Sequence, residues 1–157
     1  MNSAFRTGMS FGVTSAVITT LGMIVGLNSG THSKMVVVGG ILMIAIADAF
    51  SDSLGIHLSE EARERHSKKR VWESTIFTFL FKFVFALTFL IPILLLDLSL
   101  AVKVNIVWGM LLLGGLSYYI AKKKNAAPWK VVTEHLVIAV VVIIATNFLG
   151  NWIAGFG

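Results

Sequence analysis

Two aspartates interrupt an apolar stretch of the chain, and their type and spacing suit ion chemistry. Asp48 and Asp52 lie four residues apart, with Ala47, Ala49 and Ser53 among their small neighbours. On a helix this spacing places both carboxylates on one face, about one turn apart. Two carboxylates this close repel each other when both are ionised, so at least one binds a proton or lies beside a cation. The pair therefore indicates a cation site or a proton relay.

Lys82 gives a second interpretation of the same acids. It lies within another apolar stretch, where an ionisable group is costly unless it is paired. An ion pair between Lys82 and the acids would be purely structural. The two interpretations are compatible, because a lysine can hold the acids ionised until a cation displaces it.

A further set of ionisable residues lies near the ends of apolar stretches. They are His57, Glu60, Glu61, Glu73, Glu134 and His135. Carboxylates and imidazoles could line an entry route for a divalent cation, with His57 and Glu73 relaying protons or charge alongside Lys82. The alternative, which we favour for most of the set, is that they are solvated interface residues. Glu134 is the exception, because the unbroken apolar segment after it would carry it into the membrane.

Five apolar segments would position these side chains. A helix needs roughly 20 apolar residues to cross the hydrocarbon layer, and lipid offers no partner to an open backbone. The expected spans are residues 11–27, 35–58, 72–96, 100–121 and 131–153. Pro92 should kink the third span near its outer end. We predict an all-α integral membrane bundle of five transmembrane helices, forming a single domain over residues 1–157.

Composition and charge agree with this architecture. The chain is 56% hydrophobic and 13% charged, against roughly a quarter charged in soluble domains. Of its 13 Lys and Arg residues, two, Lys34 and Lys103, fall on one side of the expected bundle. Ten fall on the other: Arg6, Arg63, Arg65, Lys68, Lys69, Arg70, Lys122, Lys123, Lys124 and Lys130. Because cytoplasmic loops carry the excess of basic residues, we expect a cytoplasmic N-terminus and an outer or lumenal C-terminus.

Several classes of protein are disfavoured. The chain has no cysteine, which excludes disulfides and thiolate metal sites. No nucleophile elbow, phosphate-binding glycine loop or metalloprotease histidine pair is present, so we do not expect an enzyme or a permanently bound cofactor. The basic runs adjoin apolar spans and lack interleaved aromatics, which disfavours nucleic-acid binding. We expect a multi-pass protein of the bilayer, in the cell membrane if the source is prokaryotic, with its first span retained.

Glycines at four-residue spacing mark the first span. Gly22 and Gly26 form a small-xxx-small pattern, and Gly8 and Gly12 form another. Such spacing lets two helices approach closely, so Gly22 and Gly26 are a candidate dimer seam.

Taken together, these stretches resemble the vacuolar iron transporter family, whose members move ferrous iron or manganese out of the cytoplasm. The resemblance covers most of the chain. It is carried by the first span from Gly12 to Gly22, by Ala45-Ile46-Ala47-Asp48 with Ser51-Asp52, by Leu90-Ile91-Pro92, and by Glu134-His135-Leu136. It implies a five-helix, N-inside topology and a homodimer.

Three departures from the family pattern concern the metal. Ser15 stands where the family has an aspartate, Asp48 where it has a metal-binding methionine, and Asp52 where it has a glutamate. A site made only of oxygens favours harder cations. The family's long cytoplasmic helical insertion is reduced to residues 59–70.

Our leading hypothesis is a homodimeric secondary transporter that exports a divalent metal, iron or manganese, in exchange for protons. Asp48 and Asp52 would bind the metal as substrate, with Ser15 and Glu134 facing them. The competing hypothesis is a non-transporting membrane scaffold or assembly protein, in which the acids and Lys82 lock two helices together. A third is a transporter of another solute on the same helices.

Overall fold

The computed structural model describes residues 3–63, 67–124 and 126–156. Within these ranges the chain is helical almost throughout and contains no strand. The elements are α1 (Ser3–Thr31), α2 (Lys34–Met43), the π-helical segment η1 (Ile44–Asp48), α3 (Ala49–Glu61), α4 (Lys68–Thr88), α5 (Leu90–Leu95), α6 (Leu98–Lys123) and α7 (Pro128–Ala154). Arg65, counted above among the basic loop residues, lies outside the described residues.

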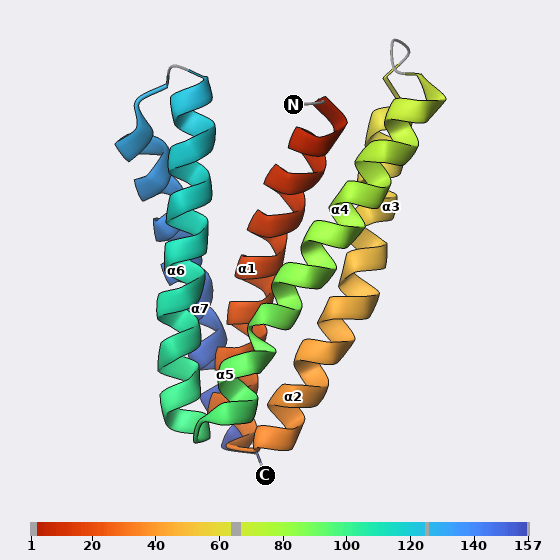
Figure 1. The fold of residues 1–157 in the computed structure, drawn as a ribbon. Helices are drawn as coiled ribbons and strands as arrows, with labels where there is room; N and C mark the ends of the chain where they lie inside the picture. The colour runs from red at the N-terminus through yellow and green to blue at the C-terminus, as the bar shows by residue number, and fades with distance from the viewer. Residues whose placement is uncertain (1–2, 64–66, 125, 157) are drawn as a thin grey trace.

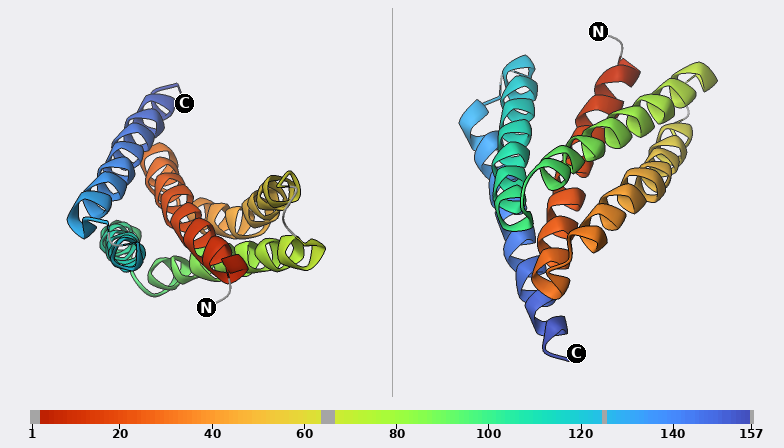
Figure 2. Two further views of the ribbon diagram at one scale, coloured as in Figure 1. Left: turned by 90° about the horizontal axis from the view of Figure 1, so that it is seen from above. Right: turned by 60° about the horizontal axis from the view of Figure 1, so that its bottom comes forward.

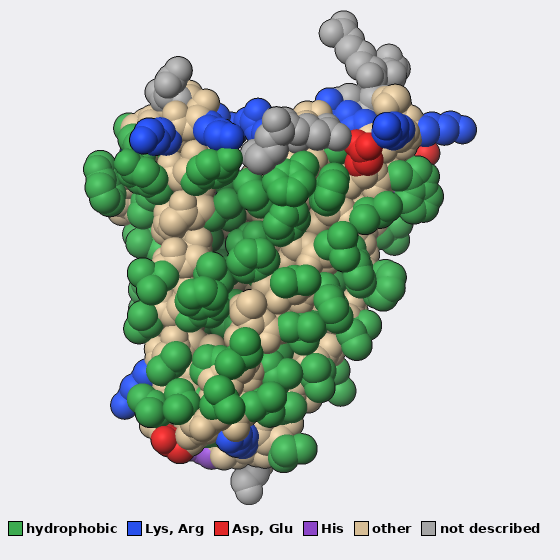
Figure 3. All heavy atoms as spheres, in the orientation of Figure 1, with side chains coloured by type: hydrophobic (Ala, Val, Ile, Leu, Met, Phe, Trp, Pro, Cys, Tyr) green, Lys and Arg blue, Asp and Glu red, His purple; other side chains and the backbone are tan. Residues whose placement is uncertain are grey.

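Five helical stretches in the described part of the chain are long and apolar enough to cross a membrane, as predicted. They are Ser3–Thr31, Lys34–Glu61, Lys68–Leu95, Leu98–Lys123 and Pro128–Ala154. Each extends beyond the apolar segment predicted from the sequence at one or both ends, because a helix continues into the polar interface where charged residues are tolerated. Large apolar side chains cover the outer surface (Figure 3), which is compatible with a multi-pass membrane protein.

Polar caps fix where several helices begin. The side chains of Ser33, Ser67 and Asp97 accept hydrogen bonds from the backbone N–H groups of Val36, Arg70 and Leu100, respectively. These caps satisfy donors that the first turn of a helix leaves free. The short connections make successive spans antiparallel (Figure 1).

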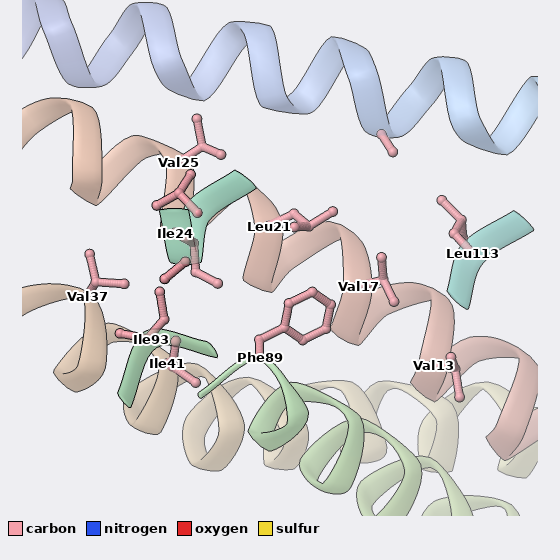
Figure 4. Close-up of a cluster of buried hydrophobic side chains, with 13 residues drawn as sticks. Val13, Val17, Leu21, Ile24, Val25, Val37, Ile41, Phe89, Ile93 and Leu113 are labelled. Atoms are coloured by element: carbon pink, nitrogen blue, oxygen red, sulfur yellow. The ribbon is translucent and has the colours of Figure 1, made fainter. Parts of the chain in front are cut away.

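Helix α1 is the centre of the bundle. It packs against α4 on one side and α7 on the other, and α6 also contacts it (Figure 2). Its buried side chains, among them Val17, Leu21 and Ile24, meet Phe89 and Leu113 in the main apolar core (Figure 4). Two helix pairs, α3 with α4 and α6 with α7, therefore flank one central helix.

The third span breaks where Pro92 predicted a kink. α4 ends at Thr88 and α5 begins at Leu90. Proline has no N–H to donate a hydrogen bond to the carbonyl four residues earlier, and its ring clashes with that carbonyl. Asn105 in α6 donates from Nδ2 to the Phe89 carbonyl at 3.0 Å. Trp108 donates from Nε1 to the Thr88 hydroxyl at 3.1 Å. The prediction of a kink is confirmed.

The N-terminus lies at one end of the bundle, together with the α3–α4 and α6–α7 connections, and the C-terminus lies at the other (Figure 1). Basic side chains gather at the N-terminal end (Figure 3). Lys34, which opens α2, lies at the opposite end, where its Nζ donates to the Leu96 carbonyl at 2.9 Å. The charge asymmetry counted along the sequence is thus also an asymmetry in space.

Candidate functional site

The two aspartates lie at the junction between η1 and α3. Asp48 is the last residue of η1, and Asp52 follows one turn later in α3. Ala45 and Ala49 on the same span are fully buried, so small side chains allow the neighbouring helices to come close. A π-helical turn accommodates an extra residue, and such turns are frequent at functional sites.

Lys82 of α4 brings its ammonium to both acids. Its side chain is 0% exposed, and its Nζ lies 2.5 Å from Oδ2 of Asp48. The same Nζ also forms an ion pair with Oδ2 of Asp52. A buried charge is tolerated only when it is paired and hydrogen-bonded, and Lys82 satisfies that condition through the acids of the preceding span.

Ser15 of α1 completes the group. Its Oγ donates a hydrogen bond to Oδ2 of Asp52 at 2.5 Å and accepts one from Lys82 Nζ at 2.8 Å. One turn further on, the Thr19 hydroxyl donates to the Ser15 carbonyl at 2.8 Å. Three helices therefore contribute to a single polar cluster, which we call the acid–lysine cluster: Ser15, Asp48, Asp52 and Lys82.

Close helix packing makes this cluster possible. A Cβ atom at Gly12 would lie 2.8 Å from the Thr78 carbonyl oxygen and 3.1 Å from the Lys82 backbone nitrogen. A side chain there would push α1 away from α4. The glycine thus sets the separation at which Ser15 reaches the ammonium of Lys82.

The cluster has the oxygen atoms of a cation site, with an ammonium among them. Two carboxylates and one hydroxyl surround Nζ, and such oxygens are the usual ligands of hard cations. With all three ionisable groups charged, the cluster carries one net negative charge. The side chains of Asp48 and Asp52 remain 30% and 20% exposed. Among the described residues, no three Asp, Glu, His or Cys side chains gather to hold a metal ion, so any third ligand would be of another kind.

His57 and Glu73 do not contact the acid–lysine cluster. Nδ1 of His57 donates to the Thr75 hydroxyl at 3.0 Å, because that hydroxyl itself donates to the Val71 carbonyl. Glu73 pairs with Lys69 at 3.8 Å. Both residues lie toward the N-terminal end of the bundle, and their role as relays stays a prediction.

Glu134 lies away from the acids. It is exposed on α7, in a shallow depression that Trp129, Val137 and Ile138 also line. α7 packs against α1 and α6, on the far side of α1 from α3 (Figure 2). The prediction that Glu134 faces Asp48 and Asp52 is therefore wrong. The next residue, His135, points into the bundle, with Nδ1 2.6 Å from the Ser117 hydroxyl.

The proposed dimer seam lies inside the chain. Cβ atoms at Gly22 and Gly26 would lie 2.8 Å from Val142 and 3.5 Å from Thr146, both on α7 of the same chain. The assignment of these glycines to a dimer contact is wrong, because they bring α1 and α7 together. A homodimer itself stays a prediction.

One buried acid was misjudged from the sequence. Glu60, interpreted as a solvated residue, has a side chain only 4% exposed, and its carboxylate pairs with Arg70 at 3.3 Å and Arg63 at 3.6 Å. The spacing of Glu60 to Arg63 is a usable signal, since residues three apart along a helix or at its end can pair. The pairing with Arg70 joins α3 to α4.

A cleft of about 680 Å³ opens at the N-terminal end of the bundle, between α1 and the facing ends of α6 and α7. Thr14 and Ile56 are among its lining residues. Thr14 precedes Ser15, and Ile56 follows Asp52 by one turn on the same face of α3. The cleft thus extends to within about one helical turn of the acid–lysine cluster.

No protein-family model matches the chain, and no curated protein matches it at a significant level. The resemblance to the vacuolar iron transporter family therefore stays an expectation based on short stretches of sequence.

Proposed function

We propose that the chain is a secondary transporter that moves a divalent metal cation, iron or manganese, out of the cytoplasm in exchange for protons. The observation that carries the proposal is the position of the Lys82 ammonium, which lies among oxygens of Asp48, Asp52 and Ser15. An intramembrane cluster that already holds one cation has the charge and the ligand atoms to hold another.

The lysine would act as a resident counter-charge. A metal ion that binds both carboxylates takes the place of the ammonium, so Lys82 must move aside for the metal to enter. Metal ligands must be deprotonated, so metal binding to a cluster of ionisable groups is linked to proton release, and metal departure to proton uptake. This linkage supports proton exchange as the coupling reaction. The oxygen-only ligands support manganese over softer ions, and iron rests on the family resemblance.

Orientation and access support export. The N-terminal end of the bundle carries most of the basic residues, which supports a cytoplasmic position for that end under the positive-inside rule. The side chains of Asp48 and Asp52 keep 30% and 20% exposure. A metal from the cytoplasm would approach them from this end of the bundle.

Metal flux into proteoliposomes that contain a pH indicator tests the proposal directly. We expect the Asp48→Asn/Asp52→Asn double variant to lose Mn²⁺- and Fe²⁺-dependent flux and the accompanying pH change. Asp97→Asn is the matched control, because Asp97 caps α6 at the other end of the bundle and asparagine caps a helix as well as aspartate. Unchanged flux in a folded double variant would overturn the proposal.

The scaffold hypothesis keeps one specific observation in its favour. Lys82 is fully buried and both acids pair with it, as in a structural lock between two spans. Thermal unfolding separates the two functions. Stabilisation by Mn²⁺ that disappears in Asp48→Asn supports transport, whereas destabilisation by Asp48→Asn and Lys82→Met without any effect of metal supports the scaffold. Flux of a different solute through the wild-type protein, abolished in the double variant, would support the third hypothesis.

A further inference from the structure

The cleft between α1 and the α6–α7 pair is ringed by positive charge. Arg6, Lys123 and Lys124 line it and are exposed. In the part of the chain that the structure describes, none of the three forms an ion pair with an acid, and no Asp or Glu is among the residues that line the cleft. Lys123 lies 4.7 Å above the ring of Tyr119. Unneutralised cations around a concave surface attract an anion.

Hydroxyl groups follow the wall of the cleft. Thr7, Ser10 and Thr14 line it at a spacing that keeps them on one face of α1. Several other hydroxyls in the bundle donate to their own helix, as Thr78 does to the Ser74 carbonyl. Within the described residues, these three hydroxyls make no such bond, so they remain available as donors to a ligand.

Much of the remaining lining is apolar, although Ser3, Tyr119 and His135 also belong to it. Met9, Phe11, Ile56 and Ile120 belong to it, and Phe11 is 41% exposed. A small soluble anion would use the basic rim and leave this apolar surface bare. A phospholipid would use both, with its phosphate among the basic residues and its glycerol and upper acyl chains on the apolar surface.

We propose that this cleft binds the headgroup of an anionic phospholipid from the leaflet at the N-terminal end of the bundle. Its volume of about 680 Å³ lies within the usual range of ligand pockets, about 300–1,000 Å³. Basic pockets between transmembrane helices on the cytoplasmic side are known to bind anionic headgroups. The assignment does not depend on metal transport, because the cleft contains none of the residues of the acid–lysine cluster.

Two double variants separate a built site from general surface charge. Lys123→Gln/Lys124→Gln removes two charges that line the cleft. Lys122→Gln/Lys130→Gln removes two exposed charges at the same end of the bundle that do not line it. Both variants change the net charge equally, and all four side chains are exposed, so the fold should tolerate either one. Thermal unfolding of both variants in nanodiscs of phosphatidylcholine alone checks that each one is folded.

The measurement is binding of phosphatidylglycerol to the full chain, by native mass spectrometry and by thermal unfolding in nanodiscs with and without this lipid. We expect phosphatidylglycerol to bind and stabilise the wild type. We expect the cleft variant to bind this lipid roughly tenfold more weakly than the wild type does. The control variant should bind like the wild type. Equal losses in the two variants, or equal stabilisation by phosphatidylcholine, would overturn the proposal. Equal stabilisation by inorganic phosphate would also overturn it, since the ligand would then be a soluble anion.

Discussion

At the scale of single residues, the balance of charge around Lys82 governs the acid–lysine cluster. One fully buried ammonium serves two carboxylates that keep some exposure. A buried charge left without a partner costs far more than the intact pair contributes. The three ionisable groups must therefore be considered together, because changing one alters the environment of the other two.

We expect Lys82→Met to be the most destabilising change in the cluster. It leaves two carboxylates facing each other without a cation, at a cost of about 3 kcal/mol, the lower end for a broken buried pair because the acids are partly exposed. Asp52→Asn should cost less, since Lys82 and Asp48 then form a neutral pair. The double variant Asp52→Asn/Lys82→Met should be more stable than Lys82→Met alone. Unfolding of the four proteins forms a double-mutant cycle, and strictly additive effects would contradict this account.

Glu60 provides a second prediction at this scale. Glu60→Gln removes the buried charge that pairs with Arg70 and joins α3 to α4. We expect a loss of about 1–3 kcal/mol in unfolding free energy, because Arg70 loses its charged partner. The neighbouring Glu61 has a side chain 68% exposed, so Glu61→Gln should change stability by less than about 0.5 kcal/mol. Similar effects of the two changes would show that burial of Glu60 has no energetic importance.

The sequence predicts part of this chemistry and leaves part of it open. The four-residue spacing places Asp48 and Asp52 on one face, and the cost of an intramembrane lysine predicts that Lys82 needs an acidic partner. The contact of Lys82 with both acids agrees with the structural interpretation of the pair. That Glu60 is buried could not be read from composition, because its burial depends on how closely α3 and α4 approach.

At the scale of helices, glycines decide which pairs come close. Gly26, Gly30 and Gly150 form the contact between α1 and α7, where Ser29 also donates to Oδ1 of Asn147 at 2.5 Å. The small-xxx-small pattern predicted close approach, which is confirmed. It could not reveal the partner, because the same spacing suits a helix of the same chain or of another copy.

We expect Gly150→Ala to loosen the α1–α7 contact. The added Cβ would collide with the Gly26 carbonyl oxygen and lie 2.9 Å from Cβ of Ser29. Overpacking of this kind costs about 1–3 kcal/mol. Gly115→Ala on α6 is the control, because no described atom outside its own stretch of helix lies within 4 Å of its Cβ position and alanine favours the helix by about 0.5–1 kcal/mol. The temperature of thermal unfolding should fall in Gly150→Ala and rise in Gly115→Ala. A change in the same direction in both variants would contradict the packing argument.

At the scale of the whole molecule, the number of spans follows from hydropathy, whereas the packing order does not. Each apolar segment is long enough to be recognised alone. Whether α7 also packs against α1 or against α3 depends on the fit of side chains between helices. A short loop constrains only helices that are neighbours in the chain. The sequence predicts how far along its span Glu134 lies, but it does not predict which face of α7 carries the residue. The predicted position of Glu134 beside the two aspartates is wrong for this reason.

The orientation of the bundle is the last prediction, and the chain is suited to testing it because it contains no cysteine. Ser59 and Ser99 are both exposed, Ser59 near the end of α3 and Ser99 near the start of α6, so they lie at opposite ends of the bundle. Each can be changed to cysteine with little change in size. Positive-inside orientation places Ser59 in the cytoplasm and Ser99 outside or in the lumen.

In intact bacterial cells expressing the protein, a membrane-impermeant maleimide should therefore label Ser99→Cys. It should label Ser59→Cys only after the cells are permeabilised. The reverse pattern would invert the bundle, and the cleft and the acid–lysine cluster would then open to the outside. In that case the proposed direction of metal movement would be wrong, because entry from the cytoplasm requires the basic end to face inward.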